Sequence, residues 1–214
     1  MSKCLLTIAI SLSLTACMIP IGSKPVATNP VSESALDKPV TPKVFDKSTA
    51  FDRTLTFRGI TFHVTSPNAG SVNTLRIQPS GLKADNSPIE RQIEGTVTNA
   101  EVADLNVDGS PELYVYVTSA GSGSHGSLVA YSANKGKSLS EIYLPQLEED
   151  KVAAKGYMGH DEFAVVENTL VRRFPIYKDG DTNSKPTGGT RQIQYKLKAG
   201  EAGWILRPDK TVSY

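Results

Sequence analysis

Oxygen-bearing side chains alternate along residues 104–112. Asp104, Asn106 and Asp108 stand at positions 1, 3 and 5 of this segment, and Gly109 follows at position 6. This is the opening pattern of an EF-hand calcium loop, because alternate residues of a tight loop converge on one point and glycine permits the sharp turn. The pattern therefore indicates a candidate site for Ca²⁺.

The second half of this acidic loop (residues 104–112) departs from an EF-hand. Position 12 is Val115, where an EF-hand has a bidentate Glu, while Glu112 at position 9 offers an oxygen. The spacing is closer to the Asp-rich strand–loop–strand calcium sites of propeller proteins. The alternative is a hairpin whose polar side chains cap their own backbone. The candidate metal ligands are Asp104, Asn106, Asp108 and Glu112.

A run of small and polar residues follows at positions 118–127, which we call the Gly/Ser loop. It carries the hydroxyls of Ser122 and Ser124, the imidazole of His125 and several glycines. It is long for a hairpin connection, and long loops of compact domains often carry function. With no bulky side chain, it is suited to entering a cleft in another molecule. The alternative is a solvated linker.

Two later stretches, residues 156–162 and 178–191, are rich in polar and turn-forming residues. Arg191 closes the second stretch beside flexible glycines, where its guanidinium is a suitable donor to carboxylates. The alternative for both stretches is ordinary turn chemistry with a surface charge.

The residue types of a hydrolase triad are present, but their context is wrong for an enzyme. Ser122 or Ser124, with His125 or His160 and Asp161, would supply the three groups. No Gly-x-Ser-x-Gly elbow stands between a strand and a helix, and the three histidines do not fall in a zinc-binding spacing. We therefore expect no enzymatic activity and no required cofactor.

The N-terminus predicts export. Lys3 precedes an apolar run at residues 4–14 that is too short to span a bilayer and is typical of a cleaved signal peptide. The sequence Leu-Thr-Ala-Cys at residues 14–17 resembles a bacterial lipobox, which makes Cys17 the lipidated first residue of the mature protein. Met18, rather than Asp, favours the outer membrane. The alternative is an ordinary signal peptide with an incidental cysteine.

The organisation expected from this is a signal peptide (residues 1–16), a lipidated tether (17–50) and a β-rich domain (51–214). The tether has prolines among small and polar residues, a composition that favours an extended, mobile chain. The membrane is thus a predicted partner through the anchor at Cys17. The only other cysteine, Cys4, is lost with the signal peptide, so we expect no disulfide in the domain.

Charge is unevenly placed along the chain. Residues 90–167 hold 13 acidic and five basic side chains, whereas residues 168–214 hold nine basic and four acidic ones. The acidic segment fits a basic protein partner, although the charges could also interleave on the folded surface and cancel. No basic patch interleaved with aromatic residues indicates nucleic acid.

The pattern of short alternating segments predicts an all-β fold, an antiparallel β-sandwich or small barrel with one short helix at residues 148–155. Residues 113–117 form the clearest strand, and a hairpin or a bulge is expected at Arg58-Gly59. Hairpins are expected around residues 167–169 and between residues 192–197 and 204–206. The other expected strands are residues 75–77, 89–97, 128–131 and 142–144.

Several of these segments together resemble the periplasmic inhibitors of i-type (invertebrate-type) lysozyme, over roughly residues 55–207. The segments that carry the resemblance are 103–106, 112–119, 128–131, 155–163, 172–177 and 188–192.

The resemblance implies a β-rich inhibitor of i-type lysozyme whose Ser-Gly-x-Tyr loop motif enters the enzyme's cleft and so protects peptidoglycan. Ser122 and Gly123 match that motif, Ser124 follows them, and His125 stands where the family has Tyr. Arg191 is the candidate for a second contact from a neighbouring loop. Separately from the resemblance, the lipobox and Met18 predict an outer-membrane lipoprotein that faces the periplasm or the cell surface. The alternative function is a calcium-dependent envelope binding or adhesion module, and a homodimer is left open.

Overall fold

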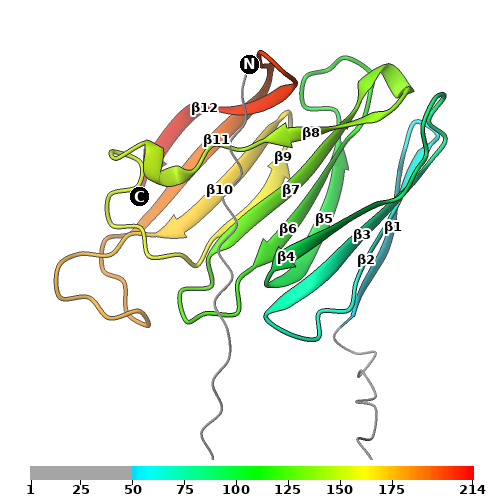
Figure 1. Cartoon of the computed structure of the whole chain (residues 1–214). Coiled ribbons are helices and arrows are strands. Elements are labelled where there is room, and N and C mark those ends of the chain that lie inside the picture. The colour runs from blue at the N-terminus through cyan, green and yellow to red at the C-terminus, as the bar shows by residue number, and fades with distance from the viewer. Residues whose placement is uncertain (1–49) are drawn as a thin grey trace, which may run out of the picture. The chain divides into compact units, whose positions relative to one another are not determined.

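The computed structural model describes residues 50–214, which form twelve β-strands and two short 3₁₀ turns (Figure 1). The strands are β1 Phe51–Phe57, β2 Ile60–Ser66, β3 Val72–Ser80, β4 Ile89–Glu94, β5 Thr96–Ala103, β6 Glu112–Thr118, β7 Gly126–Ala133, β8 Leu139–Tyr143, β9 Glu162–Val166, β10 Thr169–Pro175, β11 Thr190–Ala199 and β12 Trp204–Ser213. The all-β fold class is confirmed. The predicted signal peptide, the lipidation site Cys17 and nearly all of the predicted tether lie outside the described residues.

The first four strands form an antiparallel sheet in chain order. β1 and β2 are joined by the predicted hairpin turn, in which Arg58 and Gly59 both have positive φ, 47° and 82°. Such a two-residue turn matches the twist of the strands that it joins.

The other eight strands form a nearly closed barrel in the order β5-β6-β7-β8-β12-β11-β10-β9. All neighbours are antiparallel except β8 and β12, which run parallel at Ile142 and Trp204. The two end strands approach each other where Glu101 of β5 accepts a hydrogen bond from the Val165 N–H of β9 at 2.8 Å. The Tyr116 hydroxyl donates to the same Glu101 oxygen, Oε2.

Strand β6 is buried on both faces because it separates two hydrophobic cores. Leu113, Val115 and Val117 pack against residues of the four-stranded sheet. Tyr114 and Tyr116 point the other way, into the barrel. The alternation predicted at residues 113–117 is thus an alternation between two cores rather than between core and solvent.

Two sequence-based expectations differ from the structure. Residues 89–97 form two strands rather than one, because the chain turns at Gly95 with φ +124° and passes from the first sheet to the second. Residues 148–155 form no α-helix. A 3₁₀ turn at Leu147–Glu149 is followed by irregular turns in which the Asp150 side chain accepts the N–H of Ala153 at 3.0 Å.

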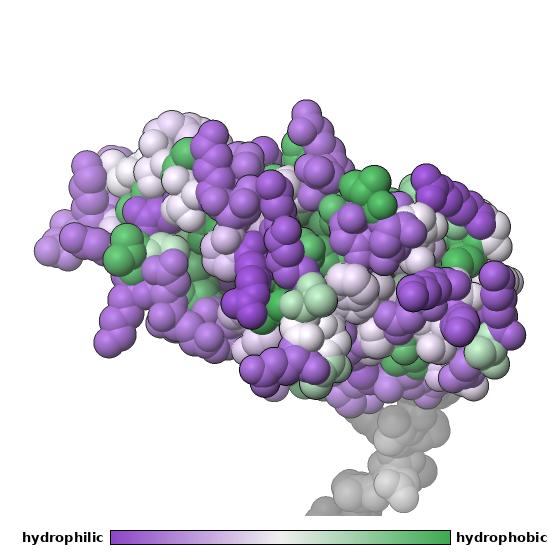
Figure 2. All heavy atoms as spheres, turned by 90° about the horizontal axis from the view of Figure 1, so that it is seen from above, coloured by the Kyte–Doolittle hydropathy of each residue, from purple (hydrophilic) through white to green (hydrophobic). Residues whose placement is uncertain are grey.

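The exterior at the upper end of the molecule in Figure 1 is mostly hydrophilic, and its hydrophobic residues stand in small separate groups (Figure 2). Within residues 50–214, no helix has the length and apolar character needed to cross a membrane.

Candidate functional site

The Gly/Ser loop connects β6 to β7 at one end of the barrel and closes into a compact bend. The Ser119 N–H donates to the His125 carbonyl at 2.9 Å, and the His125 N–H donates back to the Ser119 hydroxyl at 2.9 Å. Inside this pair, the Ser124 N–H donates to the Gly121 carbonyl at 2.9 Å. These bonds give the loop a defined backbone shape, unlike a solvated linker.

The two polar stretches, residues 156–162 and 178–191, bind the backbone of this bend on the side away from solvent. The His160 N–H donates to the Gly123 carbonyl at 2.7 Å, and the Asn183 amide donates to the Ser122 carbonyl at 2.6 Å. The backbones approach so closely that a Cβ on Gly159 would lie 1.9 Å from the Gly123 oxygen. Glycine is therefore required at position 159 both by this approach and by its φ of +96°.

A buried ion pair anchors the start of β7 to the barrel. Arg172 Nε lies 2.7 Å from Asp161 Oδ1, and both side chains are almost fully buried. The other Asp161 oxygen accepts the Gly126 N–H at 2.7 Å and the Tyr157 hydroxyl at 2.6 Å. A buried carboxylate with this set of donors is fully compensated, so it fixes Gly126 in place.

Arg172 also stabilises the aromatic surroundings of the loop. Its guanidinium donates to the Tyr157 hydroxyl at 2.9 Å and lies over the Tyr157 ring at 5.1 Å. Burial alone would lower the pKa of Arg172, but the hydrogen bond and the negative charge of Asp161 outweigh it and raise that pKa. Arg172 is therefore a permanent cation inside the barrel.

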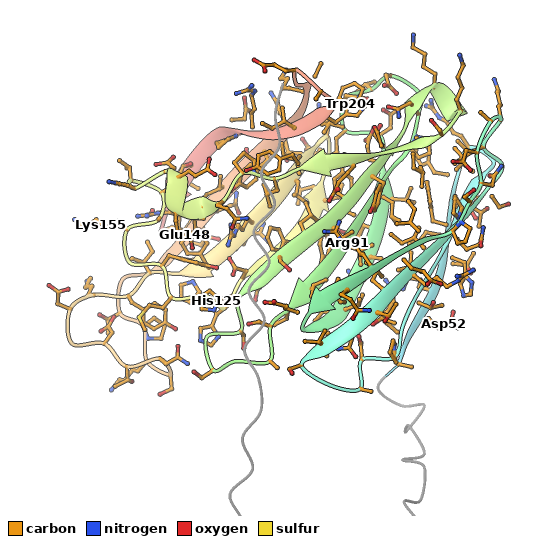
Figure 3. The ribbon with its side chains drawn as sticks, in the orientation of Figure 1. Asp52, Arg91, His125, Glu148, Lys155 and Trp204 are labelled. Atoms are coloured by element: carbon orange, nitrogen blue, oxygen red, sulfur yellow. The ribbon has the colours of Figure 1, made fainter. Side chains whose placement is uncertain are left out.

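The side chains of the bend that lie outermost are those predicted to bind a partner. Ser122 and His125 are exposed and Ser124 is half-buried. Within residues 50–214, neither serine hydroxyl has an internal hydrogen bond. The His125 ring rests edge-on against Tyr157 at 5.5 Å, and Figure 3 places it at the lower end of the barrel.

A cleft of about 710 Å³ opens beside His125. Its lining includes Arg91 and Glu94 of β4, Leu128 of β7 and Tyr143 of β8, so both sheets contribute to it. The exposed bend thus stands at the rim of a hollow surface.

The possible catalytic residues do not assemble into a hydrogen-bonded triad within the described chain. Asp161 is bonded to Arg172, Tyr157 and Gly126 rather than to a histidine. His160 Nε2 pairs with Asn183 at 3.1 Å.

Arg191, predicted to be a second partner contact, has internal hydrogen bonds. Its Nη1 donates to the carbonyls of Val152, Ala153 and Lys155 at 2.7 to 3.0 Å, and its Nε donates to Ser213 at 3.2 Å. The guanidinium thus holds the 150–156 turns in place. A direct contact of Arg191 with a partner stays a prediction.

The acidic loop lies at the other end of β6. Asp104 accepts the backbone N–H groups of Asp108 at 3.0 Å and Gly109 at 2.9 Å, and Asp108 accepts that of Ser110 at 2.8 Å. This is the self-capping turn given above as the alternative to a metal loop. Carboxylate oxygens of Asp104, Asp108 and Glu112 nevertheless lie within 4.8 Å of one another.

Glu112 is fully buried at the base of this loop. Its Oε2 accepts the Leu105 N–H at 2.8 Å, while Oε1 has no hydrogen-bond partner within residues 50–214. Burial raises the pKa of Glu112 to about 8, and the nearby charges of Asp104 and Asp108 act in the same direction.

Sequence reasoning did not single out Arg172 as a site residue. A signal was present, because Arg172 alternates with Leu170 and Phe174, which both face the barrel core. A charged residue at a core position of a strand requires a buried partner, and Asp161 in the polar stretch 156–162 is that partner.

The fold and this site define an all-β protein that presents a fixed, side-chain-poor bend to solvent. Residues 84–155, which include the acidic loop and the Gly/Ser loop, match the family described as periplasmic lysozyme inhibitor of I-type lysozyme, PliI. The match covers about a third of the 214-residue chain and lies inside the region of the resemblance described above. Members of the matched family are inhibitors and not enzymes, which confirms the expectation that the protein is not an enzyme. No curated protein and no solved structure matched the chain.

Proposed function

We propose that this protein inhibits i-type lysozyme by inserting the Gly/Ser loop into the enzyme's active-site cleft. Lysozyme as the partner and inhibition as the activity are supported by the match of residues 84–155 to the inhibitor family. The insertion mechanism is our proposal, and it rests on one observation. The backbone around Ser122 accepts hydrogen bonds from neighbouring segments of the domain, while the outer side chains of the bend face solvent.

The chemistry of the target suits these side chains. Glycosidases of this kind use paired carboxylic groups on either side of the bond that they cleave. The hydroxyls of Ser122 and Ser124 can donate to such carboxylates, and His125 can donate through its ring N–H. Hydrogen bonds to an ionised acceptor are roughly twice as strong as those between neutral groups.

The rigidity of the bend favours tight binding. A loop that is already ordered loses little conformational entropy when it enters a cleft. Here the order comes from His160, Asn183 and Asp161, none of which needs to contact the enzyme. We assign these three as positioning residues and Ser122, Gly123, Ser124 and His125 as the contact segment.

The test is an inhibition titration of i-type lysozyme with the wild type and with Ser122→Ala and His125→Ala. Each variant should weaken inhibition at least tenfold with an unchanged circular dichroism spectrum. Ser71→Ala is the matched control, because Ser71 is an exposed serine in a turn outside the Gly/Ser loop. Full inhibition by both loop variants would remove the loop from the mechanism.

The titration should be repeated with c-type and g-type lysozymes to establish the class of target. Inhibition confined to the i-type is expected from the family. Stronger inhibition of another class would instead point to His125, which replaces the Tyr of the motif, as a determinant of specificity.

We further propose that the protein acts in the periplasm from an outer-membrane anchor. The periplasmic location rests on the family description. The proposed anchor rests on the lipobox-like sequence that ends at Cys17 and on the proline-rich sequence after it, which would hold the domain away from the membrane surface.

A further inference from the structure

We propose that the acidic loop is a calcium site, with Asp104, Asn106, Asp108 and Glu112 as its ligands. This function is separate from lysozyme inhibition. It would place a divalent cation where the loop meets β6, in a position to stabilise the domain.

Three carboxylates meet at this point of the fold. One carboxylate oxygen each from Asp104, Asp108 and Glu112 lies within 4.8 Å of the other two. The amide of Asn106, with Nδ2 3.0 Å from Asp108 Oδ2, adds a fourth oxygen-bearing side chain. Loops alone produce such acidic groups without binding a metal, so the cluster needs independent support.

That support is the buried oxygen of Glu112. The side chain is fully buried, its Oε2 is held by the Leu105 N–H at 2.8 Å, and its Oε1 has no hydrogen-bond partner within residues 50–214. The Tyr114 hydroxyl faces Glu112, and it too is buried and makes no hydrogen bond of normal geometry within that range. A buried polar oxygen without a partner costs free energy, and a bound cation would remove that cost.

The basic residues near the cluster are exposed to solvent: Arg58, Lys83 and Lys135 line a surface hollow together with Asp108. The ion pair described for the cluster joins Asp104 Oδ2 to Arg58 Nη1 at 3.8 Å, and the Arg58 side chain is 62% exposed. Solvated basic side chains compensate the charges of Asp104 and Asp108 weakly. A divalent cation would compensate them better.

The donor atoms select the kind of cation. All four proposed ligand side chains offer oxygen, which suits hard cations such as Ca²⁺ rather than zinc. Ca²⁺ accepts six to eight oxygens in flexible geometry, so backbone carbonyls and waters can complete its shell, whereas Mg²⁺ requires a near-ideal octahedron. A loop whose acidic groups differ in burial, from exposed Asp108 to buried Glu112, fits the more flexible ion.

The test uses the purified protein after chelator treatment, titrated with CaCl₂ by calorimetry and by thermal unfolding. We expect one Ca²⁺ per chain, with a Kd of about 0.1 to 1 mM, the range that extracellular modules show. At a Ca²⁺ concentration ten times the Kd, the melting temperature should rise by about 3 °C.

Asp108→Asn is the test variant, because the amide keeps the oxygen that accepts the Ser110 N–H but removes the charge. It should weaken Ca²⁺ binding at least tenfold. The control is Asp85→Asn, since Asp85 accepts the Ser87 N–H at 2.8 Å in the same way but in another turn, and it should bind Ca²⁺ as the wild type does.

Three results would overturn the proposal. They are no heat of calcium binding and no thermal shift in the wild type at 10 mM CaCl₂, about ten times the weakest Kd of extracellular modules, equal loss of binding in both variants, and an equal response to MgCl₂. Without binding, the loop would be a self-capping turn only. Equal loss in both variants would mean that Ca²⁺ binds elsewhere, and an equal response to MgCl₂ would mean that the loop does not select calcium.

Discussion

Arg172 Nε lies 2.7 Å from Asp161 Oδ1 inside the barrel, and the second oxygen of the same carboxylate accepts the N–H of Gly126. One buried ion pair therefore joins the barrel core to the first residue of the strand that follows the Gly/Ser loop. Figure 3 shows that His125, the residue before Gly126, lies at the end of the barrel. The stability of the domain and the shape of the Gly/Ser loop thus depend on the same pair of residues.

The first prediction concerns this pair. Asp161→Asn keeps the shape of the side chain but leaves the Arg172 charge buried without a counterion, which costs about 3 to 5 kcal/mol of unfolding free energy in comparable cases. Denaturant unfolding should show this loss, and inhibition by the folded fraction should also weaken, because the N–H of Gly126 loses its charged acceptor.

The control for this prediction is Asp209→Asn. Asp209 pairs with Lys196 at 3.1 Å, but both side chains are about 40% exposed, and removing such a pair should cost less than about 1 kcal/mol. Equal losses in the two variants would contradict the central position given to Asp161.

The second prediction is a pH dependence set by Glu112. Its pKa is raised from 4.5 to about 8 by burial, so the folded state retains a proton that the unfolded state has released. The contribution of Glu112 to the free energy of unfolding is therefore complete below pH 4.5, and it is lost as the pH rises toward about 8. In chelator, the free energy of unfolding should fall across this window, by at most about 1.4 kcal/mol per pH unit.

Glu112→Gln tests the assignment, because the amide does not titrate. Denaturant unfolding of this variant should show a flatter profile between pH 5 and pH 8 than the wild type. An unchanged slope would mean that another group causes the dependence.

Much of the fold could be predicted because most of the strands face a core on at least one side. Residues 113–117 were the clearest strand, and β6 is the strand that both cores share. The break at Gly95 was missed because Ile93 and Val97, on either side of it, face the same core although they belong to different sheets. The apolar alternation therefore continues through the turn.

The predicted helix at residues 148–155 failed for a tertiary reason. Carbonyls of this segment accept hydrogen bonds from Arg191, almost 40 residues away along the chain. A helix of eight residues has little stability of its own. Likewise, the pattern of alternation reveals strands but not their partners, so the parallel contact of β8 with β12 was not predicted.

The third prediction separates inhibition from calcium. The seven residues of β6 stand between the two loops, a separation of about 20 Å. Inhibition of i-type lysozyme should therefore change less than twofold in chelator, at a temperature below the melting point. Lysozyme alone in chelator is the control. Loss of inhibition with an intact fold would favour the alternative, a calcium-dependent binding module.

The fourth prediction concerns the anchor. If Cys17 is acylated, metabolic labelling with a fatty acid should mark the wild type, and Cys17→Ser should move the protein from the membrane fraction to the soluble fraction. Cys4→Ser is the matched control, because Cys4 lies in the expected signal peptide. Labelling that survives Cys17→Ser would contradict the lipobox assignment.

The central claim is that the bend around Ser122 enters the lysozyme cleft, and a site-specific cross-link tests it most directly. Ser122→Cys, in a Cys17→Ser background, would carry a photoreactive group, and Ser71→Cys would carry the same group as the control. We predict that mass spectrometry finds the Ser122 cross-links on peptides that line the active-site cleft, and that a bound chito-oligosaccharide suppresses them. Cross-links outside the cleft, or cross-links that persist with the oligosaccharide bound, would contradict the mechanism.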